Sequence, residues 1–157
     1  MLEKMLSITV LLLVISACAS GQTPVRWSLA TESPVSAWKA GAKINVLITA
    51  QIVPGWHIYS ITQPAGGPIR TQITVHRGSR FKRIGPVIGP KPRRKLDDSF
   101  GMNVESYEGI ANFRFPVLLS SEAPVGRRKL MVAVRFQACN GEKCLPVKTV
   151  TLENDRR

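Results

Sequence analysis

Phe136-Gln137-Ala138-Cys139-Asn140-Gly141-Glu142-Lys143-Cys144-Leu145-Pro146 is the stretch around which the fold of this chain is interpreted. Apolar side chains take every second position before it, from Leu130 to Ala138, and the alternation resumes after it, from Val147 to Leu152. A period of two indicates β-strands. Asn140-Gly141 favours a tight hairpin turn between them, because both residues tolerate a positive φ. The stretch therefore predicts a β-hairpin with a cysteine on each side of its turn.

Cys139 and Cys144 are expected to face each other across this antiparallel pair. Opposed Cα atoms lie about 4.5 to 5.5 Å apart there, which overlaps the range that a disulfide needs. Closing so short a ring stabilises the fold by only about 2 kcal/mol, against about 4 to 5 kcal/mol for a ring of a hundred residues. The spacing alone leaves two interpretations open, a structural lock in an exported domain and a redox-active pair.

The amino-terminal segment has the composition of an export signal. Lys4 gives a short charged opening, an apolar run extends from Leu6 to Ile15, and small residues follow up to Gly21. The apolar run is too short for a comfortable membrane span. We therefore expect residues 1–17 to be a signal peptide and the protein to reach the periplasm or cell envelope, where disulfides form.

Cys18 has two interpretations. Ile15-Ser16-Ala17-Cys18 is similar to a bacterial lipobox, in which the cysteine becomes the lipid-modified first residue of the mature chain and anchors it to a membrane. Ordinary cleavage after Ala17, Ala19 or Gly21 also satisfies the rule of small residues at the cleavage site. We expect residues 18–24 to form a short linker and residues 25–157 to form a single domain.

The domain has the sequence pattern of an all-β protein. Pro and Gly recur about every ten residues, and the runs between them are rich in Val, Ile, Thr and aromatic residues, which predicts an antiparallel β-sandwich. In the clearest run, Lys43–Val53, one face carries only Ile44, Val46, Ile48, Ala50 and Ile52. The expected strands are residues 25–30, 43–53, 56–61, 69–75, 81–84, 111–118, 128–138 and 147–152.

Between Gly85 and Gly109 this strand pattern stops. Several prolines come first, followed by the basic cluster Arg93-Arg94-Lys95 and the acidic pair Asp97-Asp98. A loop of this length inside a compact domain is usually functional. We therefore expect a long loop here.

Four motifs follow one another along the chain after the expected signal: Pro54-Gly55-Trp56-His57-Ile58-Tyr59, Leu96-Asp97-Asp98-Ser99-Phe100-Gly101, Tyr107-Glu108-Gly109, and Phe136-Gln137-Ala138-Cys139 with Cys144-Leu145-Pro146. By these motifs the chain resembles the amino-terminal periplasmic domain of the thiol:disulfide interchange protein DsbD. The resemblance covers nearly the whole chain after the signal. Its specific part is the last motif, in which the two cysteines and their neighbours lie on either side of the short hairpin turn.

The resemblance implies an immunoglobulin-like sandwich with a long cap loop, and it implies roles for individual residues. Cys139 and Cys144 would be the redox pair, with no cofactor beyond their disulfide. Phe100 would match the aromatic residue of the cap loop, and Asp98 would lie beside it. Tyr59 would lie at the floor of the same site. His57 would take a position at which another family member would have a tyrosine.

The function implied by the resemblance is to carry reducing equivalents between thioredoxin-fold proteins. The donor would be a separate thioredoxin-like protein, since we expect a stand-alone exported module, and the acceptor a disulfide isomerase or a protein of cytochrome c maturation. The module would be a component of a protein-disulfide reductase. The alternative is a non-enzymatic envelope sandwich whose disulfide is structural.

Other classes of function have little support in the sequence. His57 and His76 combine with the cysteines in no zinc-ligand spacing, so we expect no metal. The formal net charge is +12, but an exported protein rarely meets nucleic acid, and no aromatic residues are interleaved with the basic clusters. Anionic headgroups or acidic partner surfaces on one side, and a merely solvated surface on the other, both explain the charge.

Overall fold

The computed structural model describes residues 23–77, 80–120 and 129–154. The expected signal peptide, Cys18 and the basic residues Arg127 and Arg128 lie outside these ranges. Within them no helix is both long and apolar enough to cross a membrane. In the described part of the chain, one 3-10 turn, η1 (Val35–Ala37), accompanies the strands, and the all-β expectation is confirmed. The strands are β1 (Val25–Thr31), β2 (Lys43–Ile52), β3 (His57–Tyr59), β4 (Gln72–Val75), β5 (Phe81–Arg83), β6 (Arg93–Asp97), β7 (Met102–Tyr107), β8 (Ile110–Leu119), β9 (Met131–Phe136), β10 (Ala138–Cys139) and β11 (Lys148–Glu153).

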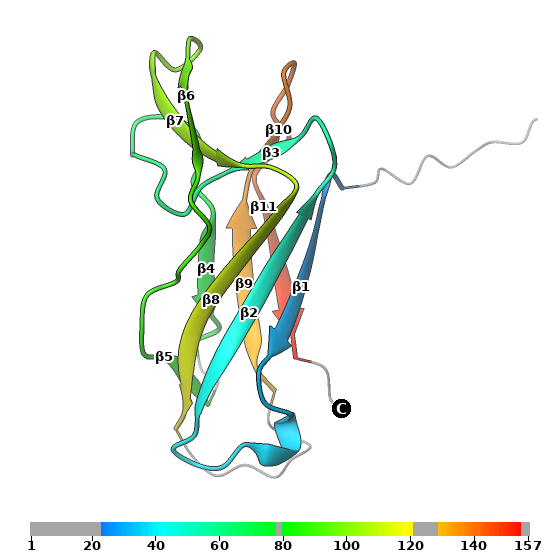
Figure 1. Cartoon of the computed structure of the whole chain (residues 1–157), viewed down its shortest axis with the longest axis vertical. Helices are drawn as coiled ribbons and strands as arrows, with labels where there is room; N and C mark the ends of the chain where they lie inside the picture. Colours follow the sequence, from blue (N-terminus) through cyan, green and yellow to red (C-terminus); the bar gives the residue numbers. More distant parts are fainter. Residues whose placement is uncertain (1–22, 78–79, 121–128, 155–157) are drawn as a thin grey trace, which may run out of the picture.

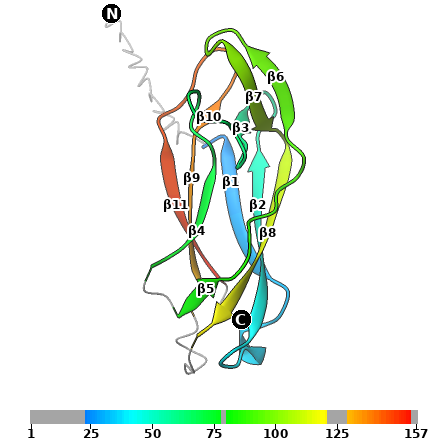
Figure 2. The same cartoon turned by 90° about the vertical axis from the view of Figure 1, so that its left-hand side faces the viewer.

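Two sheets make the sandwich and a third lies at one end of it. One sheet has the order β1-β2-β8-β5, and the sheet facing it has the order β11-β9-β4. The third sheet, β10-β3-β7-β6, lies at the upper end in Figures 1 and 2. All of these strand pairs are antiparallel. The cysteine hairpin projects from this same end (Figure 1).

The core follows from period-two alternation on the long strands. Every second residue of β2 is buried, as the sequence predicted, and β8, its neighbour in the same sheet, alternates in the same way. From the facing sheet, β9 contributes Val132, Val134 and Phe136. Aromatic rings fill the space between the sheets: Trp27 packs against Phe113 and Phe136 with centroids 6.1 and 5.2 Å apart. Burial of the apolar side chains of both sheets is the main source of stability, because a large side chain contributes about 1.5 to 3 kcal/mol when it leaves water.

The expectation of one long loop between Gly85 and Gly109 was wrong in its second half. Residues 93–107 form the β6–β7 hairpin, with pairs from Arg93↔Ser106 to Asp97↔Met102. The alternation was invisible because β6 is polar or exposed on both faces, and because β7 buries two consecutive residues, Val104 and Glu105. We call this element the cap hairpin.

The turn between the cysteines also differs from the expected one. No residue outside glycine has a positive φ among the described residues, and Gly141 is not among the glycines that do. The Asn140 side chain makes the turn instead, since its Oδ1 accepts hydrogen bonds from the backbone N–H groups of Glu142 and Lys143 at 3.0 and 2.8 Å. The backbone N–H of Asn140 donates to the Lys143 carbonyl at 2.9 Å.

Candidate functional site

The cysteine hairpin forms where the chain changes sheets. Strand β9 pairs with β11 up to Phe136, and after Gln137 the chain continues as β10, which pairs with β3. The Gln137 amide donates to the Leu145 carbonyl at 3.2 Å, and the Leu145 N–H donates to the Ala138 carbonyl at 2.9 Å. These bonds hold the two arms of the hairpin together beyond the end of the β11-β9-β4 sheet.

Cys139 and Cys144 face each other and are joined, as their spacing predicted. They form an antiparallel bridge, with Cα atoms 4.0 Å apart and an S–S bond of 2.03 Å. Their surroundings differ: Cys139 is 1% exposed, whereas Cys144 is an exposed residue beside the polar turn. One half of the disulfide is therefore accessible to a partner and the other half lies in the protein.

His57 and Tyr59 lie on the same face of the third sheet as Cys139. His57 is the direct cross-strand partner of Cys139, and opposed residues of an antiparallel pair project from the same face. Tyr59, two residues further along β3, shares that face. The His57 and Tyr59 rings meet edge to face with centroids 5.2 Å apart. Thr71 holds the end of β3 in place, since its hydroxyl donates a hydrogen bond to the Tyr59 carbonyl at 2.6 Å.

Burial sets the protonation of both rings. It lowers the pKa of His57 below the ordinary value, although the charges of Glu108 and Asp97 act in the opposite direction. It raises the pKa of Tyr59, and the charge of Asp97 raises it further. At neutral pH the site therefore presents a neutral imidazole and a protonated phenol next to Cys139.

The cap hairpin supplies the side chains that cover Cys139. Val104 is 6% exposed and forms one apolar cluster with Tyr59 and Cys139, and Met102 packs against that cluster. Met102 also lies close over Gly67, where an added Cβ would be only 2.6 Å from the methionine sulfur. Sequence reasoning missed Met102 and Val104, since two apolar residues in an otherwise polar segment give no distinctive strand pattern.

Phe100 and Asp98 lie in the turn at the tip of the cap hairpin. The turn is closed by Asp97, whose carbonyl accepts from the Phe100 N–H at 3.2 Å and whose side chain accepts from the Ser99 N–H at 3.0 Å. Phe100 is 43% exposed and Asp98 is exposed. Of the two adjacent aspartates, Asp97 rather than Asp98 is the one whose charge acts on both His57 and Tyr59, and Glu108 acts on His57 more strongly still. Sequence reasoning had singled out Asp98.

A buried carboxylate anchors the base of the cap hairpin. Glu105 is 5% exposed and accepts hydrogen bonds from the hydroxyls of Ser60 and Thr62, which follow β3. Arg94 of β6 binds its other oxygen through Nε at 2.9 Å and Nη2 at 2.8 Å. The Glu105 N–H donates to the Gln63 side chain at 2.6 Å. The bonds from Thr62, Ser60 and Arg94 to the carboxylate lower the pKa of Glu105, the Thr62 bond most of all, although burial acts in the opposite direction.

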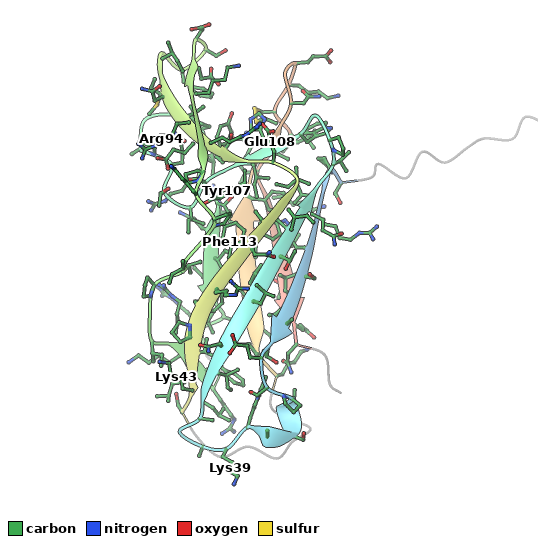
Figure 3. The ribbon with its side chains drawn as sticks, viewed as in Figure 1. Lys39, Lys43, Arg94, Tyr107, Glu108 and Phe113 are labelled. Atoms are coloured by element: carbon green, nitrogen blue, oxygen red, sulfur yellow. A yellow bond between two sulfur atoms is a disulfide. The ribbon has the colours of Figure 1, made fainter. Side chains whose placement is uncertain are left out.

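The opposite end of the molecule lies far from the disulfide and the cap hairpin. Figure 3 shows Arg94 and Glu108 at the end that carries the cap hairpin, and Lys39 and Lys43 at the opposite end. Tyr107 and Phe113 lie between them, with ring centroids 5.4 Å apart, and join the cap hairpin to the core. Among the described residues, no three His, Cys, Asp or Glu side chains gather as metal ligands do.

Fold and site together define a class, an immunoglobulin-like β-sandwich that carries a half-exposed disulfide at one end under a hairpin. Residues 28–156 match the family model for the amino-terminal region of the thiol:disulfide interchange protein DsbD. The chain belongs to this family, as the four motifs had indicated.

Solved structures that share the fold include two amino-terminal domains. The amino-terminal domain of Neisseria meningitidis DsbD in its reduced form is 17% identical, with a TM-score of 0.51 over 73% of this chain and 78% of that one. The amino-terminal periplasmic domain of ScsB from Proteus mirabilis is 15% identical, with a TM-score of 0.55 over 82% of this chain and 45% of that one. None of the curated proteins compared with the sequence matches it.

Proposed function

We propose that this protein is an exported thiol:disulfide exchange module that carries reducing equivalents between thioredoxin-fold proteins through Cys139 and Cys144. The observation that carries the proposal is the asymmetry of the pair, with Cys144 exposed and Cys139 1% exposed. Exchange needs one sulfur that a partner can reach and a second that resolves the mixed disulfide. Membership of the DsbD amino-terminal family supports the same chemistry.

The reaction would run in two balanced displacements. A thiolate of the reduced donor attacks the Cys144 sulfur, the bond to Cys139 breaks, and Cys139 leaves as a thiolate that takes up a proton. The donor's second thiolate then displaces Cys144 and completes the two-electron reduction of the pair. Towards an acceptor the order is reversed: the Cys144 thiolate attacks the acceptor's disulfide, and Cys139 then attacks Cys144 to release the reduced acceptor.

The proposed partners and location follow the family and the chemistry. A thioredoxin-like donor and a disulfide isomerase or cytochrome c maturation protein as acceptor suit a module of this kind, and the matched domain of ScsB is periplasmic. We place this protein in the periplasm or cell envelope for the same reason. Lipidation at Cys18 would keep it at a membrane surface.

The cap hairpin would protect the pair between encounters. Phe100 lies at its tip, and closure of the hairpin over the exposed cysteine would exclude small thiols while a docking partner displaces the ring. Asp98 in the same turn, together with Asp97, would disfavour a stray thiolate through like-charge repulsion.

Trapping with single-cysteine variants tests the proposal. We use a Cys18→Ser background, so that Cys139 and Cys144 are the remaining cysteines of the chain. The probe is a thioredoxin-fold protein with one active-site cysteine, activated as its nitrothiobenzoate disulfide. Cys139→Ala should form a stable mixed disulfide through Cys144, whereas Cys144→Ala should form little, because its remaining thiol is buried. The reverse pattern, or no adduct with either variant, contradicts the assigned roles.

A further inference from the structure

His57 lies beside the buried cysteine on the third sheet. It is the cross-strand partner of Cys139, which places the two side chains on one face with Cβ atoms about 4.5 to 5.5 Å apart. Its ring also meets Tyr59, whose side chain forms the apolar cluster with Cys139 and Val104. His57 is only half-buried, so a proton that it takes up can pass on to solvent.

Cys139 is the group in this site that needs a base. To resolve a mixed disulfide it must attack as a thiolate, and an apolar environment favours the neutral thiol instead. Cys144 is exposed and can lose its proton directly to water. The demand for a proton acceptor therefore falls on the buried sulfur, next to which the fold places an imidazole.

We infer that His57 accepts the proton of the Cys139 thiol while Cys139 attacks the Cys144 sulfur, which makes it a positioned base for the resolving step. The inference rests on the proposed exchange function and adds a role that is specific to one of its two displacements. In that step the proton moves to the imidazole, the Cys139–Cys144 bond forms, and the bond from Cys144 to the partner breaks. The electron pair of the broken bond leaves with the partner's thiolate.

The other groups around His57 fit this role. Tyr59 stays protonated, because burial and the charge of Asp97 raise its pKa, so it cannot serve as the acceptor. Glu108 and Asp97 favour the imidazolium once it forms, and Lys95 opposes it. Burial is the largest influence and keeps the imidazole neutral before the step.

The two phases of the reaction with Ellman's reagent separate the two sulfurs. In the reduced Cys18→Ser protein, Cys144 displaces the first nitrothiobenzoate in a bimolecular phase. Cys139 then displaces the second in a unimolecular phase that does not depend on the concentration of the reagent. We would measure both phases from pH 5 to pH 10 for the parent protein, for His57→Phe and His57→Gln, and for His76→Phe. The last variant is the control, since it removes the exposed imidazole that follows β4.

Both His57 variants should slow the second phase at pH 7 by about a hundredfold, the lower end of the range for general base catalysis, and leave the first phase within about twofold. In the parent, the second phase should level off above the pKa of His57. In the variants it should climb by about tenfold per pH unit until Cys139 itself ionises. His76→Phe should behave as the parent does.

Three outcomes contradict the inference or its basis. A second phase with the parent's rate and pH profile in His57→Phe shows that the imidazole takes no proton. An equal slowing at every pH shows a purely structural role. A parent protein that releases no second nitrothiobenzoate contradicts the exchange function itself, so the two failures are distinct.

Discussion

At the residue scale, one disulfide joins two cysteines in opposite environments. The difference arises at Gln137, where the chain leaves β9 and enters β10, because Cys139 is carried under the cap hairpin while Cys144 stays in the projecting turn. A hairpin continuing in one sheet would expose both sulfurs to a similar degree. The change of sheet is therefore what gives the pair one exposed and one buried member, as the proposed roles of attacker and resolver require.

Phe100→Ala should speed the reduction of the disulfide by glutathione severalfold, because the ring would no longer shield the pair from small thiols. The fold should stay intact, since Phe100 is 43% exposed and contributes little to the core. The reaction is followed by the rate of appearance of free thiols. Leu96→Ala is the control, since Leu96 is an exposed apolar residue of the same hairpin, 57% exposed. If both variants react at the parent's rate, Phe100 does not guard the pair.

Met102→Ala should uncover Cys139. In a Cys144→Ala background, alkylation of Cys139 by iodoacetamide should become severalfold faster, while Met102→Leu should keep the slow rate because it restores the apolar cover. The truncation should also lower the free energy of unfolding by about 2 kcal/mol, the lower end of the range for Met→Ala in a core. Equal alkylation rates in all three proteins would show that Val104 and Tyr59 suffice as cover.

Single residues of the site could be predicted unevenly. The structure brings together four residues that the sequence had indicated: His57, Tyr59, Cys139 and Cys144. They could be predicted because each belongs to a short motif around a strand or a turn. Met102 was missed because one methionine after a glycine has no distinctive pattern. The proximity of Asp97 to the two rings depends on the register of β6 against β7, which adjacent aspartates do not reveal.

At the scale of elements, the cap hairpin depends on one buried carboxylate. Glu105 binds the hydroxyls that follow β3 on one side and Arg94 of β6 on the other. The hairpin was not predicted as strands because its stability comes from this polar network and from pairing, and neither produces an apolar alternation. The main sandwich was predicted because its strands alternate strictly.

Glu105→Gln should lower the free energy of unfolding at pH 7 by about 1.5 to 3 kcal/mol, the range for hydrogen bonds to charged groups. Its folded-state pKa lies below the ordinary value of 4.5. The contribution of the carboxylate is therefore complete above that value and is lost as the pH falls through the lower folded-state pKa. Urea unfolding at pH 7 and at pH 3 should show the variant and the parent converging in acid.

Glu108→Gln is the matched control for this prediction. Glu108 pairs with Arg93 at the surface, at 2.7 Å and with its side chain 50% exposed, so its loss should cost less than about 1 kcal/mol. A gap between the Glu105 variant and the parent that is as large at pH 3 as at pH 7 would show that the neutral amide fails for reasons of shape.

At the scale of the whole molecule, the hydrophobic core and the disulfide site are separate. The two sheets of the sandwich bury their long alternating strands against each other, and the site lies on the third sheet at one end (Figures 1 and 2). The ring closed by the disulfide is short, so opening it removes only about 2 kcal/mol of stabilisation. Opening the disulfide is therefore not expected to unfold the protein, which the proposed carrier function requires.

The reduction potential of the Cys139–Cys144 pair tests the central claim most directly. It is measured by equilibrating the Cys18→Ser protein in dithiothreitol and glutathione redox buffers and counting free thiols. A carrier that exchanges with thioredoxin-fold partners should have a potential between about −180 and −280 mV, the range of thioredoxin and its relatives. A potential well below about −300 mV is typical of structural disulfides and would contradict the proposed function.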